Sequence, residues 1–93
     1  MWEVHITKRA LRSAKRLAIL ERLIKFAEDL RDSLNEDEAG TLSSLAREPV
    51  IEVEGLPTHR VRMGKYRIFI LIDRRGRRAV IVDVRHRREA YRR

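Results

Sequence analysis

The chain has 93 residues, of which 39% are charged, with a formal net charge of +8 and no cysteine. This length allows one domain with one modest core. The absence of thiols excludes a disulfide framework and a thiolate metal site. No apolar run reaches the roughly 18 residues that a membrane-spanning helix needs, and no apolar signal segment stands at the start. We therefore expect a single domain over residues 1–93, soluble and cytoplasmic, that does not bind a membrane.

The first element is a short strand, because Trp2, Val4 and Ile6 alternate with polar residues. Thr7 follows at the position of a helix N-cap, so we predict that a helix begins at Lys8.

Residues 8–34 carry apolar side chains on two nearly opposite sides of a helical projection. One straight helix over this range is about 40 Å long, longer than the roughly 30 Å expected across such a domain. We predict two helices instead, with a break near Ala18 and Ile19 although no Gly or Pro marks it. The pair forms a helical hairpin that covers the apolar face of a sheet.

Residues 35–40, Asn-Glu-Asp-Glu-Ala-Gly, are interpreted as an acidic loop, and residues 41–46 as a helical turn because Leu42 and Leu45 are three apart. Residues 50–54 fit a strand or an extended loop equally well. Gly55 and Pro57 punctuate the entry to the last third of the chain.

Residues 59–91 predict three strands joined by two tight turns. Gly64 and Lys65 form a two-residue hairpin loop between apolar runs. This loop places Arg62 opposite Arg67 and Arg60 opposite Phe69. The second loop is predicted to comprise Arg74, Arg75 and Gly76, with the glycine at positive φ. That register places Arg67 opposite Asp83, and a four-residue loop is rejected because it exposes the valines of the last strand.

Alternation along these strands sorts the side chains into two faces. The apolar face is predicted to form the core and carries Val61, Met63, Tyr66, Ile68, Ile70, Ile72, Val80, Val82 and Val84. The other face carries Arg60, Arg62, Arg67, Asp83 and Arg85, with Arg87 just beyond and Phe69, Leu71 and Ile81 at its border.

Charge is distributed unevenly along the chain. Residues 59–93 hold 13 Lys and Arg against 3 Asp and Glu, a net charge of +10, whereas residues 1–58 hold 9 against 11. Such a segment predicts a polyanionic partner, most simply nucleic acid. The Arg62–Arg67 pair repels, which a fold tolerates when an anion binds there. In the alternative interpretation, Asp83 neutralises Arg67 and the remaining charges form a solvated face.

The residue types suit cleavage of an RNA phosphodiester. The 2′-hydroxyl attacks its own phosphate when the protein orients it and stabilises the developing charge, and guanidinium groups grip phosphate oxygens in a bidentate manner. Tyr91 is a candidate base if neighbouring arginines lower its pKa, or else an aromatic anchor for the tail. His86 is a second candidate base, or else a surface residue. The histidines have no metal-ligand spacing, and neither a metal nor another cofactor is expected.

The order of elements, and above all two segments, resemble the RelE/ParE superfamily of toxins from bacterial and archaeal toxin–antitoxin pairs. The segment HRVRMGKYRIFILID is similar to the family's YRvRvGdYRviyxid, and VDVRHRREAY to its VxxVGHRrevY. The resemblance implies an α+β fold in which an N-terminal strand and a two-helix hairpin precede a three-strand antiparallel meander (β-α-α-β-β-β), with the helices on one face of the sheet. RelE-like members cut mRNA in the ribosomal A site, whereas ParE-like members poison DNA gyrase.

The RelE pattern implies particular roles for residues of this chain. Arg67 stabilises the transition state, Arg87 lies near the leaving 5′-oxygen, and Tyr91 is the base, so these three are the expected catalytic residues. The expected substrate-binding residues are Arg60, Arg62, Arg85 and His86. Two departures from the pattern are His59 in place of an aromatic residue and Arg85 in place of the glycine of the GHR element.

We therefore expect a RelE-like toxin, an endoribonuclease acting on translated mRNA and the ribosome and neutralised by a small acidic antitoxin. Two alternatives stand beside it. One is a ParE-like toxin that inhibits gyrase without nuclease activity, and the other is an inactive basic module that binds RNA.

Overall fold

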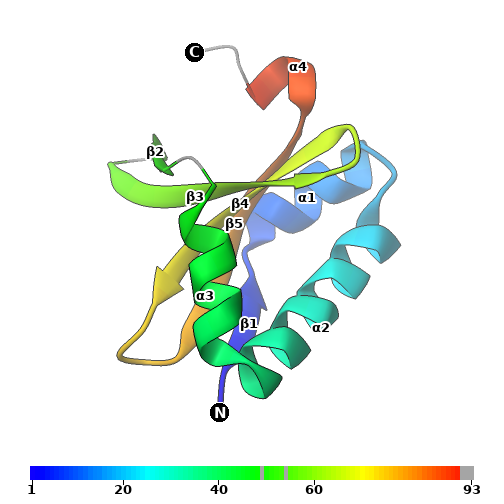
Figure 1. Cartoon of the computed structure of the whole chain (residues 1–93). Coiled ribbons are helices and arrows are strands. Elements are labelled where there is room, and N and C mark those ends of the chain that lie inside the picture. Colours follow the sequence, from blue (N-terminus) through cyan, green and yellow to red (C-terminus); the bar gives the residue numbers. More distant parts are fainter. Residues whose placement is uncertain (49, 54, 91–93) are drawn as a thin grey trace.

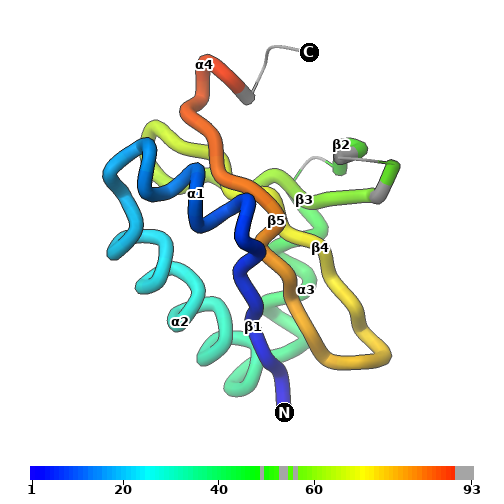
Figure 2. The backbone as a smooth tube through the Cα atoms, turned by 180° about the vertical axis from the view of Figure 1, so that it is seen from behind, coloured from blue at the N-terminus to red at the C-terminus, as the bar shows by residue number. Residues whose placement is uncertain are grey.

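A five-stranded sheet carries α2 and α3 on one face, while α1 runs beside β5 (Figures 1 and 2). The computed structural model describes residues 1–48, 50–53 and 55–90. The predicted α+β class, with a strand and helices before an antiparallel meander, is confirmed. None of the described helices is long and apolar enough to span a bilayer. The elements are β1 (Glu3–Ile6), α1 (Lys8–Arg16), α2 (Leu20–Glu36), α3 (Glu38–Ala46), β2 (Val50–Val53), β3 (Leu56–Met63), β4 (Tyr66–Asp73), β5 (Arg78–His86) and α4 (Arg87–Ala90).

The predicted start of the first helix is confirmed. Thr7 is the N-cap of α1, and its hydroxyl oxygen accepts a hydrogen bond from the Ala10 amide at 3.1 Å. The same hydroxyl donates to the Val82 carbonyl at 3.0 Å, so the cap also ties α1 to β5.

The predicted break between the two helices is also confirmed, and the backbone explains it without Gly or Pro. Ala18 has φ +59, in the left-handed region. The Ala18 amide donates to Lys15 O at 3.1 Å and the Ile19 amide to Ala14 O at 2.8 Å. These two bonds form a Schellman motif in which alanine occupies the usual glycine position. The Cα positions of the domain extend only 31 Å at most, so an unbroken helix of about 40 Å would overrun it.

The predicted acidic loop at residues 35–40 is wrong, because these residues belong to two helices. Helix α2 continues to Glu36, and α3 begins at Glu38 and includes the predicted helical turn. The Asp37 carboxylate accepts a hydrogen bond from the Gly40 amide at 3.1 Å and thereby caps α3. Residues 35–40 therefore comprise the end of α2, the capping residue Asp37 and the first turn of α3.

The sheet order is β1-β5-β4-β3-β2, with β1 parallel to β5 and the other neighbours antiparallel. Residues 50–53, which the sequence left open, form the edge strand β2. The main core lies between the sheet and the helices, where apolar side chains lose their contact with water. Its buried members are Trp2, Ala10, Ala14, Ile19, Leu23, Ala27, Leu30, Leu34, Leu45, Ile68, Ile70, Ala79, Ile81 and Val84.

The first hairpin has the predicted register. Arg62 pairs with Arg67 and Arg60 with Phe69. Gly64 has φ +60 in the two-residue loop, a conformation that favours glycine.

The register predicted for the second hairpin is wrong, because its loop has four residues. Asp73 pairs with Arg78, and the Arg77 amide donates to Arg74 O at 3.3 Å. The residue at positive φ is Arg77, at +52, rather than Gly76. The Asp73 carboxylate explains the longer loop, since it accepts from the Gly76 amide at 3.0 Å and from Arg78 Nη2 at 3.0 Å. A Cβ on Gly76 would lie 2.6 Å from Asp73 Oδ2, so glycine is required here for a close approach.

A β-bulge then changes which residues of β5 face the core. The pairing is irregular between Phe69 and Ile70, so that Val82 is an extra residue on β5. Before the bulge, Ala79 and Ile81 enter the core in place of the predicted Val80 and Val82. After it, Val84 faces the core and Asp83 pairs with Phe69 on the other face.

Candidate nucleic-acid interface

Three arginines stand in register across the three central strands, on the face of the sheet away from α2 and α3. Arg67 on β4 pairs with Arg62 on β3 and with Arg85 on β5. We call these three residues the arginine row. Like charges directly opposite each other on neighbouring strands are destabilising. The row is therefore a place where an anion would relieve repulsion, and the register makes it longer than the single Arg62–Arg67 pair that the sequence predicted.

Arg67 is the most buried member of the row, with 7% of its surface exposed. Its Nη1 donates to Tyr66 O at 3.1 Å and to Gly64 O at 3.4 Å. Arg67 therefore holds the first hairpin loop as well as contributing charge, whereas Arg62 is exposed.

Asp83 neutralises Arg85 and Arg9 rather than Arg67, which corrects the pairing expected from the sequence. Its carboxylate lies 2.8 Å from Arg85 Nε and 3.4 Å from Arg9 Nε, and only 3% of the residue is exposed. It also accepts hydrogen bonds at 2.9 Å from the Ser13 hydroxyl and from the Val84 amide. A charge that is buried needs such partners. Asp83 therefore fixes Arg85 at one end of the row.

Helix α1 contributes cations that the sequence analysis missed. A cavity of about 360 Å³ lies where α1, β5 and α4 meet and is lined by Arg9, Ser13, Arg16, Asp83, Arg85 and Glu89. Arg16 is paired with Glu89 at 3.6 Å. The spacing of residues 9, 13 and 16 places them on one helix face. This polar stripe is the sequence signal that indicates the contribution of α1 to the site.

The second cross-strand line of this face holds Arg60, Phe69 and Asp83. Phe69 is fully buried, and the Arg85 guanidinium carbon lies 5.1 Å from its ring centroid. This cation–π contact orients Arg85 over the sheet. Because its ring is covered, Phe69 supports Arg85 and is not a platform for stacking on a base.

His86 does not join the arginine row. It pairs with Tyr66, whose ring meets the His86 ring edge-on at a centroid distance of 5.6 Å. Tyr66 in turn packs against the core and lies beneath Arg22 of α2. His86 Nδ1 accepts a hydrogen bond from the Arg88 amide at 3.2 Å. His86 is thus placed on the side of the sheet opposite Arg85.

The start of α4 is attached to the first hairpin loop. The Arg87 amide donates to Lys65 O at 2.7 Å, and the Arg87 side chain is exposed. This bond brings Arg87 to the end of the sheet where the row lies. Tyr91, the predicted base, lies outside the described residues.

Two comparisons with known proteins agree with this fold, and no curated protein sequence matches the chain. A chain in the crystal structure of the toxin–antitoxin complex RelBE2 from Mycobacterium tuberculosis superposes with a TM-score of 0.64 at 26% identity. The superposition covers 91% of the present chain and 96% of that one. The sequence profile of the ParE toxin of the type II toxin–antitoxin system parDE matches residues 4–91. The chain therefore belongs to the ParE toxin family of type II toxin–antitoxin systems, within the RelE/ParE superfamily.

Proposed function

We propose that this toxin is an endoribonuclease that cleaves translated mRNA, with the ribosomal A site as its place of action. The observation that carries the proposal is the arginine row, a strip of three like charges with one end anchored by Asp83. Such a strip suits a phosphodiester whose charge grows in the transition state.

The proposed reaction needs no group beyond the substrate, this chain and water. The 2′-oxygen of one nucleotide attacks the adjacent phosphorus, and the bond from phosphorus to the 5′-oxygen breaks. The products are a 2′,3′-cyclic phosphate and a 5′-hydroxyl, whose proton comes from water. Arg60 and Arg62 bind substrate phosphates together with Arg85, and Arg67 stabilises the charge on the reacting phosphate. In this proposal Arg87 lies near the leaving oxygen, and Tyr91 removes the proton from the 2′-hydroxyl. His86 is also proposed as a substrate-binding residue, although its ring lies against Tyr66, on the side of the sheet opposite Arg85.

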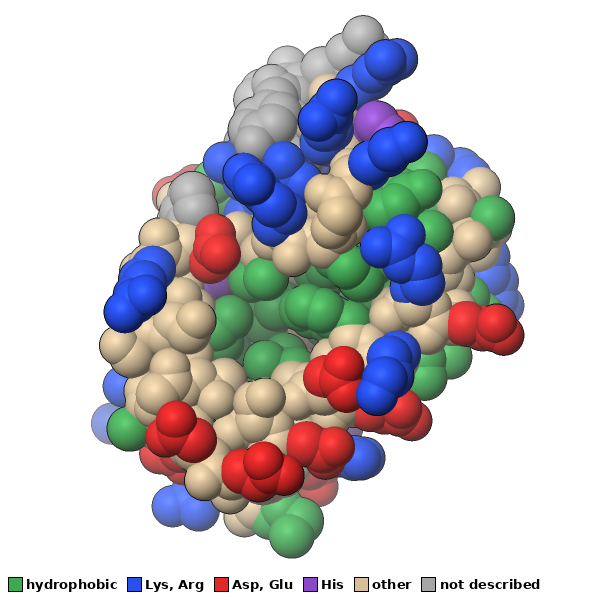
Figure 3. Space-filling view, turned by 45° about the vertical axis from the view of Figure 1, so that its right-hand side comes forward, with side chains coloured by type: hydrophobic (Ala, Val, Ile, Leu, Met, Phe, Trp, Pro, Cys, Tyr) green, Lys and Arg blue, Asp and Glu red, His purple; other side chains and the backbone are tan. Residues whose placement is uncertain are grey.

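We also propose a small acidic antitoxin as the partner, because the structural neighbour was crystallised as a toxin–antitoxin complex. Two surfaces suit such a partner. The first is the basic face already described. The second is a groove of about 290 Å³ between α2 and α3 whose apolar members are Phe26, Leu30, Leu45 and Val61. Figure 3 shows hydrophobic side chains on the floor of a hollow on this side of the molecule, with acidic side chains along its lower border. An apolar segment of the antitoxin fits a hollow of this kind.

Gyrase inhibition is the second candidate function, and two observations favour it. The matching family profile is that of ParE toxins. In addition, Arg67 donates to two backbone carbonyls and is mostly buried, so part of its donor capacity is committed to the fold.

Induction of the chain in cells separates the two functions. Primer extension on total mRNA is compared with trapping of gyrase–DNA cleavage complexes in the same cultures. Cuts within translated reading frames and unchanged gyrase support the nuclease, whereas intact mRNA with trapped gyrase would establish the second function instead.

A further inference from the structure

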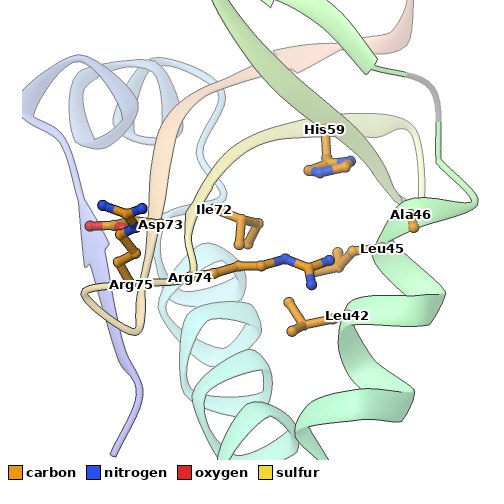
Figure 4. A pocket seen from close by; sticks show the side chains of 8 residues that line it. All are labelled: Leu42, Leu45, Ala46, His59, Ile72, Asp73, Arg74 and Arg75. Atoms are coloured by element: carbon orange, nitrogen blue, oxygen red, sulfur yellow. The ribbon is translucent and has the colours of Figure 1, made fainter.

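A second cavity, of about 370 Å³, lies between α3, His59 of β3 and the end of β4 with the loop that follows it (Figure 4). The cavity is separate from the arginine row. Arg60 lies on the same face of β3 as Arg62, and the adjacent His59 points to the opposite face. Leu42 and Leu45 of α3 and Ile72 of β4 form apolar walls. A cavity of this size falls within the range of small-ligand sites.

A lining residue of the cavity carries a polar atom that lacks a partner. His59 Nδ1 is buried and, among the described residues, makes no hydrogen bond. Buried ring nitrogens are normally paired, because a buried polar group without a partner costs about 1–3 kcal/mol. The His59 ring points into the cavity from β3 (Figure 4). The site is therefore short of one hydrogen-bonding group.

A guanidinium group faces the same space. The Arg74 side chain extends across the cavity toward Leu45 (Figure 4), and none of its described contacts is a side-chain hydrogen bond or ion pair. The neighbouring Arg75 also borders the cavity, but its side chain points away from Leu45 and lies beside Asp73 (Figure 4). The Asp73 carboxylate already holds Arg78 and the Gly76 amide, so it is committed to the loop.

We propose that this cavity binds a carboxylate carried on a short branched aliphatic group. The aliphatic part packs between Leu42, Leu45 and Ile72, and the carboxylate oxygens accept hydrogen bonds from Arg74. A turn of the imidazole ring brings His59 Nδ1–H, which is covered in the free chain, to the same carboxylate. A guanidinium fork matches a carboxylate in geometry and charge. A small free acid and the carboxyl terminus of a partner chain that ends in leucine share this chemistry.

The test is a titration of the purified, isotope-labelled chain with 4-methylpentanoate, followed by NMR. We expect saturable shifts in the amide signals of residues 42–46, 59 and 72–74, and in the His59 ring nitrogens. The uncharged 4-methylpentanamide should bind at least about tenfold more weakly, since it lacks the charge that Arg74 pairs with. Equal binding of acid and amide, or no saturable shift, would overturn the proposal.

Matched variants identify the binding group. Arg74→Ala should weaken acid binding about tenfold, while Arg75→Ala, which removes the same charge from the adjacent residue, should change it less than twofold. Arg74→Gln keeps most of the side-chain length and checks that any loss is not a folding effect. Equal losses in Arg74→Ala and Arg75→Ala would contradict the site.

Two peptides that end in Ala-Leu, one with a free carboxylate and one amidated, distinguish a partner's carboxyl terminus from a small free acid as the ligand. Tighter binding of the free-carboxylate peptide than of 4-methylpentanoate assigns the site to a partner's terminus. Equal affinity assigns it to a small acid, and equal binding of the two peptides would count against the carboxylate itself.

Discussion

Arg67 on β4 lies directly opposite Arg85 on β5, and no acidic side chain stands between them in the cross-strand register. The nearby Asp83 is two residues earlier on β5 and pairs with Phe69. Its carboxylate contacts Arg85 Nε at 2.8 Å. The fold thus fixes Arg85 beside Arg67, so that the guanidinium groups of the arginine row are held close together on one face, an arrangement that suits binding of a phosphate.

Replacing Asp83 with Asn should destabilise the fold by about 1–3 kcal/mol. The amide keeps one acceptor but leaves the Arg9 and Arg85 guanidinium groups without their shared anion. Urea unfolding measures the change. Glu89→Gln is the matched control, because Glu89 lines the same cavity and is exposed, and its effect should stay below about 0.5 kcal/mol. Equal effects of the two changes would show that burial of Asp83 is unimportant.

Replacing Ala18 with Gly should stabilise the chain by up to about 1 kcal/mol. Ala18 has φ +59, where a Cβ costs roughly 1–2 kcal/mol, partly offset by the greater freedom of glycine in the unfolded chain. Ala14→Gly, four residues earlier in the body of α1, should instead destabilise by about 1 kcal/mol or more. Thermal melting of both variants tests this reversal of sign, and a loss of stability in Ala18→Gly would argue against the Schellman motif.

The loop carboxylate Asp73 should make stability depend on pH. Hydrogen bonds from the Gly76 amide, and then from Arg78, hold the pKa of Asp73 below its ordinary value of 3.8. A lowered folded-state pKa means that this contribution is complete above 3.8 and is lost as the pH falls through the folded value. Asp73→Asn should therefore be less stable than the parent near neutral pH, and the gap should close in acid. Asp32→Asn, an exposed change on α2, is the control. A gap that stays constant down to low pH would exclude the carboxylate as its cause.

Association with an acidic antitoxin should be fast at low salt and slow steeply as ionic strength rises. Residues 59–93 carry a net charge of +10, and long-range attraction between exposed charges is screened by salt. Stopped-flow mixing over a salt series measures this dependence. A rate indifferent to salt would mean that apolar contacts, such as those of the groove between α2 and α3, govern the encounter.

Local signals predicted the first hairpin correctly and the second one only in part. Gly64 and Lys65 define a two-residue loop, which allows only one pairing register between β3 and β4. The second loop depends on the Asp73 carboxylate reaching the Gly76 amide, and the bulge at Val82 coincides with the point where Thr7 bonds to that residue's carbonyl. The longer loop and the bulge each shift the pairing of β5 against β4 by one residue. Two such shifts restore the original face, so Asp83 and Arg85 still lie on the predicted face.

The candidate site was predictable along the strands but not between distant elements. Alternation identified Arg60, Arg62, Arg67 and Arg85 because strand residues two apart share a face. The contact of Ser13 with Asp83 joins residues 70 apart, and nothing local indicates it. The start of α3 does have a local sequence signal, since Asp37 precedes Gly40 at the spacing of an N-cap.

The rate of RNA cleavage in a single turnover, on ribosome-bound mRNA, tests the nuclease proposal most directly. The parent chain should cut within the reading frame, and Arg67→Ala should lower the rate on the order of a hundredfold. Arg31→Ala removes an exposed arginine from α2, away from the row, and should leave the rate nearly unchanged. Melting curves confirm that both variants are folded. No cleavage by the parent chain, or equal rates for the two folded variants, would contradict the account.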